Sequence, residues 1–174
     1  MDAALEQMIA RDAIRQCLER LARGEDRRDA DLIRSCWWPE ATYDYGVQSG
    51  DFASYLAWVV PGADAIKDTQ HVLGQSYTVI EGSTARVETH VMSYHRIDMG
   101  AGDRDTCIGG RYLDRMECRD GEWRIAERVM LYDFFSDWGA AIDWGQGVMG
   151  LPFTAPHFAG NAVGDFSEVF FGKR

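Results

Sequence analysis

The sequence predicts an α+β fold in which N-terminal helices pack on one face of a curved, mostly antiparallel sheet. Apolar residues recur at helical spacing before residue 60 and alternate from residue 70 onward, and Gly-containing turns separate the alternating runs. Helices followed by a run of antiparallel strands are typical of this class. A chain of 174 residues also suits one domain with a sizeable core.

Helices are expected in three segments. Residues 3–22 carry apolar side chains at the spacing of an amphipathic helix, and Gly24 is expected to end it. A second, short helix is predicted over residues 29–36, with Pro39 closing the segment. The stretch "GDFASYLAWVV", residues 50–60, fits a third helix that ends at "PGAD".

Strands are expected around these helices and up to residue 133. The segment "ATYDYG" predicts a short strand that places Tyr43 and Tyr45 on one face and Asp44 on the other. The alternating pattern then predicts strands at 71–80, 84–97, 105–118 and 122–133, with "EGST" and "RDGE" as turns. Residues 1–133 are therefore expected to form a single domain. Residues 134–174 are expected to form an extension that wraps this domain or a neighbouring subunit.

Charge and composition argue against several classes of function. A formal net charge of -10 disfavours a nucleic acid partner and an anionic membrane surface. No apolar run approaches the roughly 20 residues that span a bilayer, and no secretory signal is expected. The four cysteines are widely spread, which indicates reduced thiols and a cytoplasmic location. Metal-ligand spacings and a glycine-rich phosphate loop are absent, so neither a metal nor a cofactor is expected.

The histidines divide between the two faces of the predicted sheet. In "TARVETHVMSYHRI", residues 84–97, His95 shares the parity of the apolar positions and is expected to point inward, whereas His90 is expected to point outward. His71 opens the preceding strand, and Asp26 follows the first helix. The inward side chains could therefore converge at one end of the sheet, together with the two tyrosines of residues 41–46.

A histidine beside a carboxylate is typical of general acid–base chemistry. The carboxylate fixes the tautomer of the ring and raises the basicity of its free nitrogen, which makes a base that needs no cofactor. Asp26 and His71 would supply this pair, and Tyr45 and His95 would polarise or protonate an oxygen on the substrate. The alternative is a buried structural pair that only ties a helix to the sheet.

Other polar and aromatic side chains allow two interpretations each. Glu25 is a solvated loop charge, which is slightly favoured, or a second acid near the histidine. A first set of aromatic residues either lines a substrate pocket or belongs to the core: Trp37, Trp38, Phe52, Tyr55 and Trp58. A second set of aromatic residues, in the C-terminal segment, either closes the pocket or lies in a subunit interface: Trp138, Trp144, Phe153 and Phe158.

Residues 5–133 resemble the SnoaL-like and scytalone dehydratase-like branch of the nuclear transport factor 2-like superfamily. The segments "GEDRRDADLIRSCWWPEATYDYG", "TQHVLG" and "IGGRYLDRMECRDGEWRIAER" carry the resemblance. "SCWWPEA" and "IGG" are also similar to hexachlorocyclohexane dehydrochlorinase. The resemblance implies a cone-shaped sheet with His71 as catalytic histidine, Asp26 as its partner, and Tyr45 and His95 in the pocket.

The chain also departs from the pattern of the dehydratases. Glu25 replaces a tyrosine, and Gly110 and Tyr112 replace a serine and an asparagine. These departures predict a differently shaped pocket. The candidate substrate-binding residues are Tyr43, Glu25, Trp38, Tyr55 and Tyr112.

The resemblance implies a cofactor-independent lyase acting on a bulky aromatic or polycyclic alcohol. His71 would act as general base, and water or a small fragment such as formaldehyde would leave. One alternative is an isomerase or polyketide cyclase that uses the same base. Another is a non-catalytic binding or assembly module, such as the small subunits of ring-hydroxylating dioxygenases. The resemblance further implies a homo-oligomer, either a dimer or a trimer.

Overall fold

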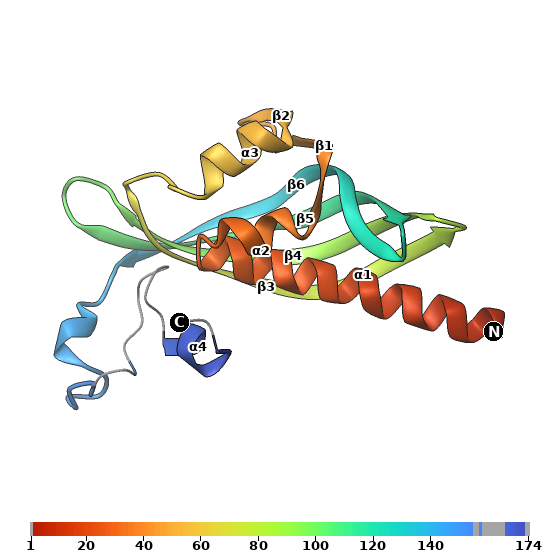
Figure 1. Cartoon of the computed structure of the whole chain (residues 1–174). Helices are drawn as coiled ribbons and strands as arrows, with labels where there is room; N and C mark the ends of the chain where they lie inside the picture. Colours follow the sequence, from red (N-terminus) through yellow and green to blue (C-terminus); the bar gives the residue numbers. More distant parts are fainter. Residues whose placement is uncertain (1, 155–156, 158–165, 173–174) are drawn as a thin grey trace.

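The computed structural model describes residues 2–154, 157 and 166–172, and it confirms the predicted fold class. Six strands form one curved, unclosed sheet in the order β2-β1-β6-β5-β4-β3. Neighbouring strands are antiparallel except β1 and β6, which are parallel. The helices α1 and α2 lie across one face of the sheet, and α3 stands over the end formed by β1 and β2 (Figure 1).

The helices and strands have the following bounds. The helical elements are α1 (Ala3–Asp26), α2 (Ala30–Arg34), α3 (Phe52–Val59), the 3-10 helix η1 (Trp144–Gln146) and α4 (Phe166–Phe170). The strands are β1 (Trp37–Asp44), β2 (Ser49–Asp51), β3 (Ile66–Glu81), β4 (Thr84–Asp98), β5 (Asp103–Arg119) and β6 (Glu122–Ala140).

Helix α1 does not end at Gly24, so this prediction was wrong. The helix continues through Gly24 to Asp26. A Cβ atom at Gly24 would lie 2.9 Å from Cγ1 and 3.2 Å from the backbone nitrogen of Ile33 in α2. The glycine therefore permits the close approach of α2 rather than a turn. As a consequence, Glu25 and Asp26 are fixed in the last turn of a helix.

We expect Gly24→Ala to destabilise the fold by about 1–3 kcal/mol, the usual cost of overpacking. Intrinsic helix propensity alone would make the alanine variant more stable by about 1 kcal/mol. The sign of the change in the free energy of unfolding therefore distinguishes overpacking from helix propensity. Urea denaturation of the two proteins measures it. A variant as stable as the wild type would contradict the close packing of α1 on α2.

Several predicted strand limits also differ from the structure. Helix α2 ends at Arg34, and β1 begins at Trp37, so Pro39 lies inside a strand instead of closing a helix. The pairing of β1 with β6 is irregular between Trp37 and Thr42, and a residue without an N–H is tolerated at such an irregularity. Strand β3 begins at Ile66, and β6 continues to Ala140.

The turn between β5 and β6 agrees with the sequence pattern. Asp120 and Gly121 both have positive φ angles, of 52° and 82°, between the paired residues Arg119 and Glu122. Two residues with positive φ match the twist of an antiparallel hairpin. This turn places β6 beside β5 along most of its length.

The core lies between the helices and the concave face of the sheet. Its buried side chains include Ile14, Leu18, Leu21, Ile33, Val87, Met116 and Ile125. The predicted parity of β4 is confirmed, because Ala85, Val87 and Val91 are buried, while the side chain of His90 is 46% exposed.

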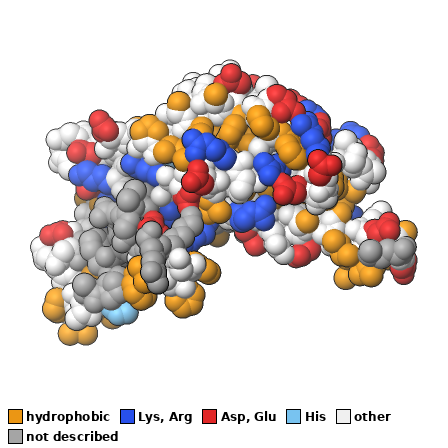
Figure 2. Space-filling model, in the orientation of Figure 1, with side chains coloured by type: hydrophobic (Ala, Val, Ile, Leu, Met, Phe, Trp, Pro, Cys, Tyr) orange, Lys and Arg blue, Asp and Glu red, His pale blue; other side chains and the backbone are white. Residues whose placement is uncertain are grey.

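On the viewed surface, acidic and basic side chains are interspersed (Figure 2). Within the described part of the chain, no helix is long and apolar enough to cross a membrane.

Candidate active site

Asp26 and His71 lie in direct contact where the end of α1 meets β3. The Nδ1 atom of His71 is 2.7 Å from Oδ1 of Asp26. The backbone N–H of His71 also donates to this carboxylate, with N–O distances of 3.0 and 3.2 Å. The carboxylate therefore fixes both the strand and the ring, and it favours a proton on Nδ1. The Nε2 atom is left to exchange protons with another group.

Glu25 lies on the other side of the same ring. Its Oε2 atom is 3.8 Å from Nε2 of His71. Its Oε1 atom accepts a hydrogen bond from the hydroxyl of Tyr55 and lies 4.0 Å from Nη1 of Arg128. Glu25 is only 8% exposed, so the favoured interpretation as a solvated loop charge is wrong. The imidazole of His71 is thus flanked by two carboxylates.

The charges around His71 act on its pKa in opposite directions. Burial lowers the pKa, but the hydrogen bond to Asp26 and the negative charge of Glu25 raise it by more. The resulting pKa of His71 is above its usual value. A raised pKa makes the ring a stronger base, which holds an accepted proton more firmly.

Arg128 is a site residue that the sequence did not reveal. Its guanidinium is buried and makes two hydrogen bonds to Asp114, with distances of 2.7 and 2.9 Å. It also lies 4.0 Å above the ring of Tyr112. The pairing of β5 with β6 shifts register between Arg115 and Met116, and the shift reverses the parity of β6. This irregularity turns Arg128 inward.

Buried tyrosines surround this charged cluster. Tyr45, Tyr55 and Tyr112 are all less than one tenth exposed. The ring centroid of Tyr45 lies 6.0 Å from that of Tyr55 and 6.1 Å from that of Tyr112. Burial raises the pKa of Tyr45, so its hydroxyl stays protonated and can donate a hydrogen bond. Tyr43 packs against the same group, and its buried hydroxyl has no hydrogen-bond partner among the described residues.

His95 lies near His71, as the sequence predicted from parity. The two ring centroids are 6.3 Å apart. The Nδ1 atom of His95 is buried and has no hydrogen-bond partner among the described residues. Burial, together with the positive charge of His71, lowers the pKa of His95 to about 4. His95 is therefore neutral near pH 7.

We expect the ring of His95 to titrate near pH 4 in an NMR titration of the folded protein. Between this value and the unfolded pKa of about 6.5, the unfolded chain binds a proton that the folded chain does not. Folding stability should therefore rise with pH across that window and lose this dependence in His95→Gln. A titration midpoint near 6.5 would contradict the burial of this ring.

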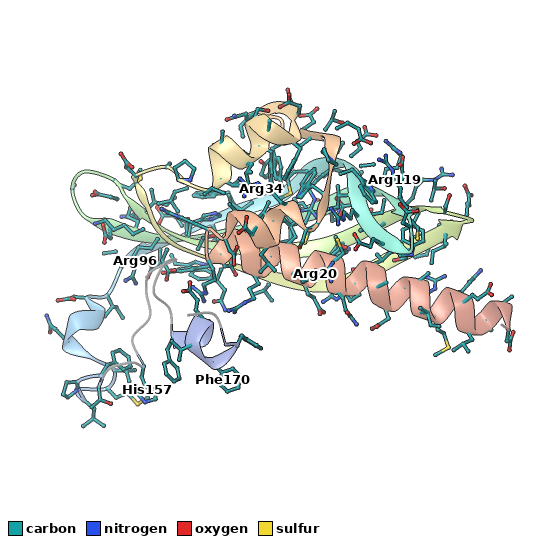
Figure 3. All side chains as sticks on the ribbon, in the orientation of Figure 1. Arg20, Arg34, Arg96, Arg119, His157 and Phe170 are labelled. Atoms are coloured by element: carbon teal, nitrogen blue, oxygen red, sulfur yellow. The ribbon has the colours of Figure 1, made fainter. Side chains whose placement is uncertain are left out.

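One of the predicted aromatic positions, Trp38, lies away from His71. Trp38 donates its indole N–H to the carbonyl of Glu117, and the guanidinium of Arg119 lies 4.5 Å from its ring. Arg119 and Arg96, the residue after His95, lie at opposite ends of the sheet (Figure 3). The structure therefore does not bring Trp38 to the histidines. Trp37 packs on Phe52 and on Tyr55 in the core, with ring centroids 5.6 and 4.7 Å apart.

The remaining aromatic residues divide between the site and the C-terminal segment. Trp58 packs against Tyr43 and Tyr45, so it joins the tyrosine cluster. Trp138 stacks on Tyr94, whose side chain points to the opposite face of β4 from that of His95. Together with Phe153, Trp138 lines a separate cavity of about 660 Å³. The side chain of Trp144 and the whole of Phe158 lie outside the described residues.

A groove of about 300 Å³ gives access to the Asp26–His71 pair from the side of α1. Arg15, Arg23 and Leu73 lie along it beside the pair. Among residues 2–154, 157 and 166–172, no group of three or more histidine, cysteine or acidic side chains is arranged to hold a metal ion. The chemistry that these residues can supply on their own is proton transfer and hydrogen bonding.

Solved structures with a similar fold include two dehydrochlorinases. Hexachlorocyclohexane dehydrochlorinase LinA type 2 is 17% identical, with a TM-score of 0.71 over 90% of this chain and 100% of that chain. LinA type 3 from Novosphingobium barchaimii LL02 is 18% identical, with a TM-score of 0.69 over 88% and 100%. At this identity the likeness shows the fold alone.

A third solved structure, from Novosphingobium aromaticivorans DSM 12444, is named provisionally as a scytalone dehydratase. It is 15% identical, with a TM-score of 0.67 over 78% of this chain and 91% of that chain. A search of curated proteins found no match.

The helices and the curved, unclosed sheet define a protein of the nuclear transport factor 2-like fold. The model of the SnoaL-like domain family matches residues 6–129. The chain therefore belongs to the SnoaL-like family, as the sequence motifs predicted.

Proposed function

We propose that this protein is a cofactor-independent lyase that acts on a bulky aromatic or polycyclic alcohol. The observation that carries the proposal is the 2.7 Å contact between Nδ1 of His71 and the Asp26 carboxylate, beside a cluster of buried tyrosines. Such a pair is a general base that needs neither metal nor cofactor. The leaving group would be water or a small fragment such as formaldehyde.

In this mechanism Nε2 of His71 removes a proton from the substrate. Asp26 holds the ring in the required tautomer and stabilises the imidazolium that forms. The protonated hydroxyl of Tyr45 and the neutral ring of His95 would hydrogen-bond the oxygen on which charge develops. General acid–base catalysis of this kind contributes roughly 10²–10⁴-fold to a rate.

The surroundings of the base support an aromatic substrate. Tyr43, Tyr45, Tyr55 and Trp58 present ring faces and edges to one another, with centroid distances between 5.1 and 6.3 Å. Edge-to-face and offset contacts at such distances are the arrangements that aromatic rings prefer with one another. The named structural neighbours support an elimination, since a dehydrochlorinase removes HCl and a dehydratase removes water.

Two other functions would use the same fold. An isomerase or cyclase would use the same base without loss of a group. A binding or assembly module would need no base, and its interior would be filled with apolar side chains. Buried Glu25, Asp114 and Arg128 do not fit that expectation, because they place charged side chains in the interior that such a module would fill with apolar ones.

A screen of aromatic and polycyclic alcohols, followed by mass spectrometry, tests the proposal. We expect products whose mass is lower by water or formaldehyde, formed without added cofactor. Products of unchanged mass would indicate an isomerase instead. A complete lack of conversion across the screen would favour the binding module.

A further inference from the structure

The carboxylate of Glu25 lies close enough to His71 to influence a proton transfer at its ring. Its two carboxylate oxygens face different groups. Oε1 is held by the hydroxyl of Tyr55, while Oε2 is turned toward Nε2 of His71, 3.8 Å away. This separation is longer than a hydrogen bond, so Nε2 is not already occupied by Glu25. It is nevertheless short enough for a strong interaction between charges in a buried site.

We propose that Glu25 is a positioning residue that acts through His71, by stabilising the imidazolium formed when Nε2 accepts the proton of the substrate. The inference rests on the proposed function, because it takes His71 as the proton acceptor. The lone pair on Nε2 forms the new N–H bond, and the broken substrate bond leaves its electron pair on the substrate. The positive ring then lies between the carboxylates of Asp26 and Glu25.

The other charges near His71 do not cancel this effect. Arg128 approaches Glu25 to 4.0 Å, but its guanidinium is engaged by Asp114 at 2.7 and 2.9 Å. Most of its charge is therefore balanced by Asp114, and the carboxylate of Glu25 remains a net negative charge beside the ring. His95 faces His71 from β4 and is neutral near pH 7.

The groove side of His71 carries charges of both signs. The charged residues that line it are Arg15, Glu19, Arg23 and Asp26 of α1, and Arg27 directly after the helix. Arg15 is paired with Glu19 at 2.8 Å, and the side chain of Glu19 is 56% exposed. Solvent screens these exposed and partly exposed charges, so they affect His71 less than the buried carboxylate of Glu25 does.

The test is Glu25→Gln, which keeps the volume of the side chain and removes its charge. In an NMR titration of the substrate-free protein, we expect the midpoint of His71 to move to lower pH by about one unit or more. The rising limb of the pH–kcat profile should move in the same direction, and the plateau kcat should fall because the base is weaker. Glu25→Asp, which keeps the charge, should restore most of the wild-type midpoint and rate.

Glu122→Gln is the matched control, because Glu122 is an exposed glutamate at the far hairpin, paired with Arg124. We expect it to leave the midpoint and kcat unchanged. An unchanged His71 midpoint in Glu25→Gln would overturn the proposal. If Glu25→Gln does not fold, Glu25→Asp alone must still lower the midpoint, by less, because its carboxylate is one methylene further from the ring.

The titration separates this inference from the proposed function. A shifted midpoint without turnover of any alcohol would remove the lyase function and, with it, the catalytic part of the inference. Turnover by the wild type with no shift in Glu25→Gln would leave the function intact and remove the role of Glu25.

Discussion

Replacing His71 with alanine is expected to lower kcat by about 10²–10⁴-fold, the usual contribution of a general base. The ring is the group whose Nε2 can accept the substrate proton while Nδ1 is held 2.7 Å from Asp26. The backbone N–H of His71 also bonds to Asp26, and this contact survives the substitution, so the junction of α1 and β3 should persist. Steady-state kinetics on an alcohol from the screen, together with circular dichroism, measure both effects.

Asp26→Asn tests the same pair from the other side. The amide keeps the shape of the carboxylate, but it loses the charge that stabilises the imidazolium and fixes the tautomer. We therefore expect a loss of kcat comparable to that of the alanine variant. Asp12→Asn on the same helix is the control, since Asp12 bonds to Gln16 on the exposed surface. Full activity in Asp26→Asn would mean that the pair only ties the helix to the sheet.

The raised pKa of His71 also sets opposite pH dependences for catalysis and stability. A base must be neutral, so kcat should rise as pH increases through the folded pKa. The contribution of this ring to stability has the other sign. It is fully present below the unfolded pKa of about 6.5 and is lost as pH rises through the folded value. The site therefore works best where its own histidine stabilises the fold least.

Much of this arrangement follows from local patterns in the sequence. The alternation in "TARVETHVMSYHRI" was enough to place His95 inward and His90 outward. The Asp-Gly dipeptide at 120–121 located the β5–β6 hairpin. The pairing of Asp26 with His71 rested on an assumed fold in which these side chains converge at one end of the sheet, and the family resemblance implied the same pair. No local pattern connects the two residues, because they are separated in sequence.

The features that the sequence did not reveal depend on tertiary contacts. Gly24 was interpreted as a helix end, whereas it allows α2 to pack closely, and this keeps Glu25 in the helix and buried. Arg128 follows the polar pattern of an exposed hairpin, and only a register shift in the sheet turns it inward. Trp38 was assigned to the pocket, but a single aromatic residue in a strand does not indicate which end of the sheet it occupies.

The buried pair of Asp114 and Arg128 is where we expect the largest change in stability. Asp114→Ala removes both hydrogen bonds of a guanidinium that is 2% exposed, and it leaves the charge buried with Glu25 4.0 Å away. Breaking a buried ion pair in this way costs about 3–5 kcal/mol, because the guanidinium stays buried and charged but loses its hydrogen-bonded partner. Urea denaturation monitored by circular dichroism measures the loss.

The same two strands supply a matched control on the opposite face. Arg111 of β5 pairs with Asp133 of β6 at 3.0 Å, but these side chains are 30% and 42% exposed. Asp133→Ala should therefore cost no more than about 1 kcal/mol. Equal losses in the two variants would show that burial does not set the strength of the inner pair. A larger loss in Asp114→Ala would show that the cost comes from leaving the guanidinium of Arg128 buried without its partner.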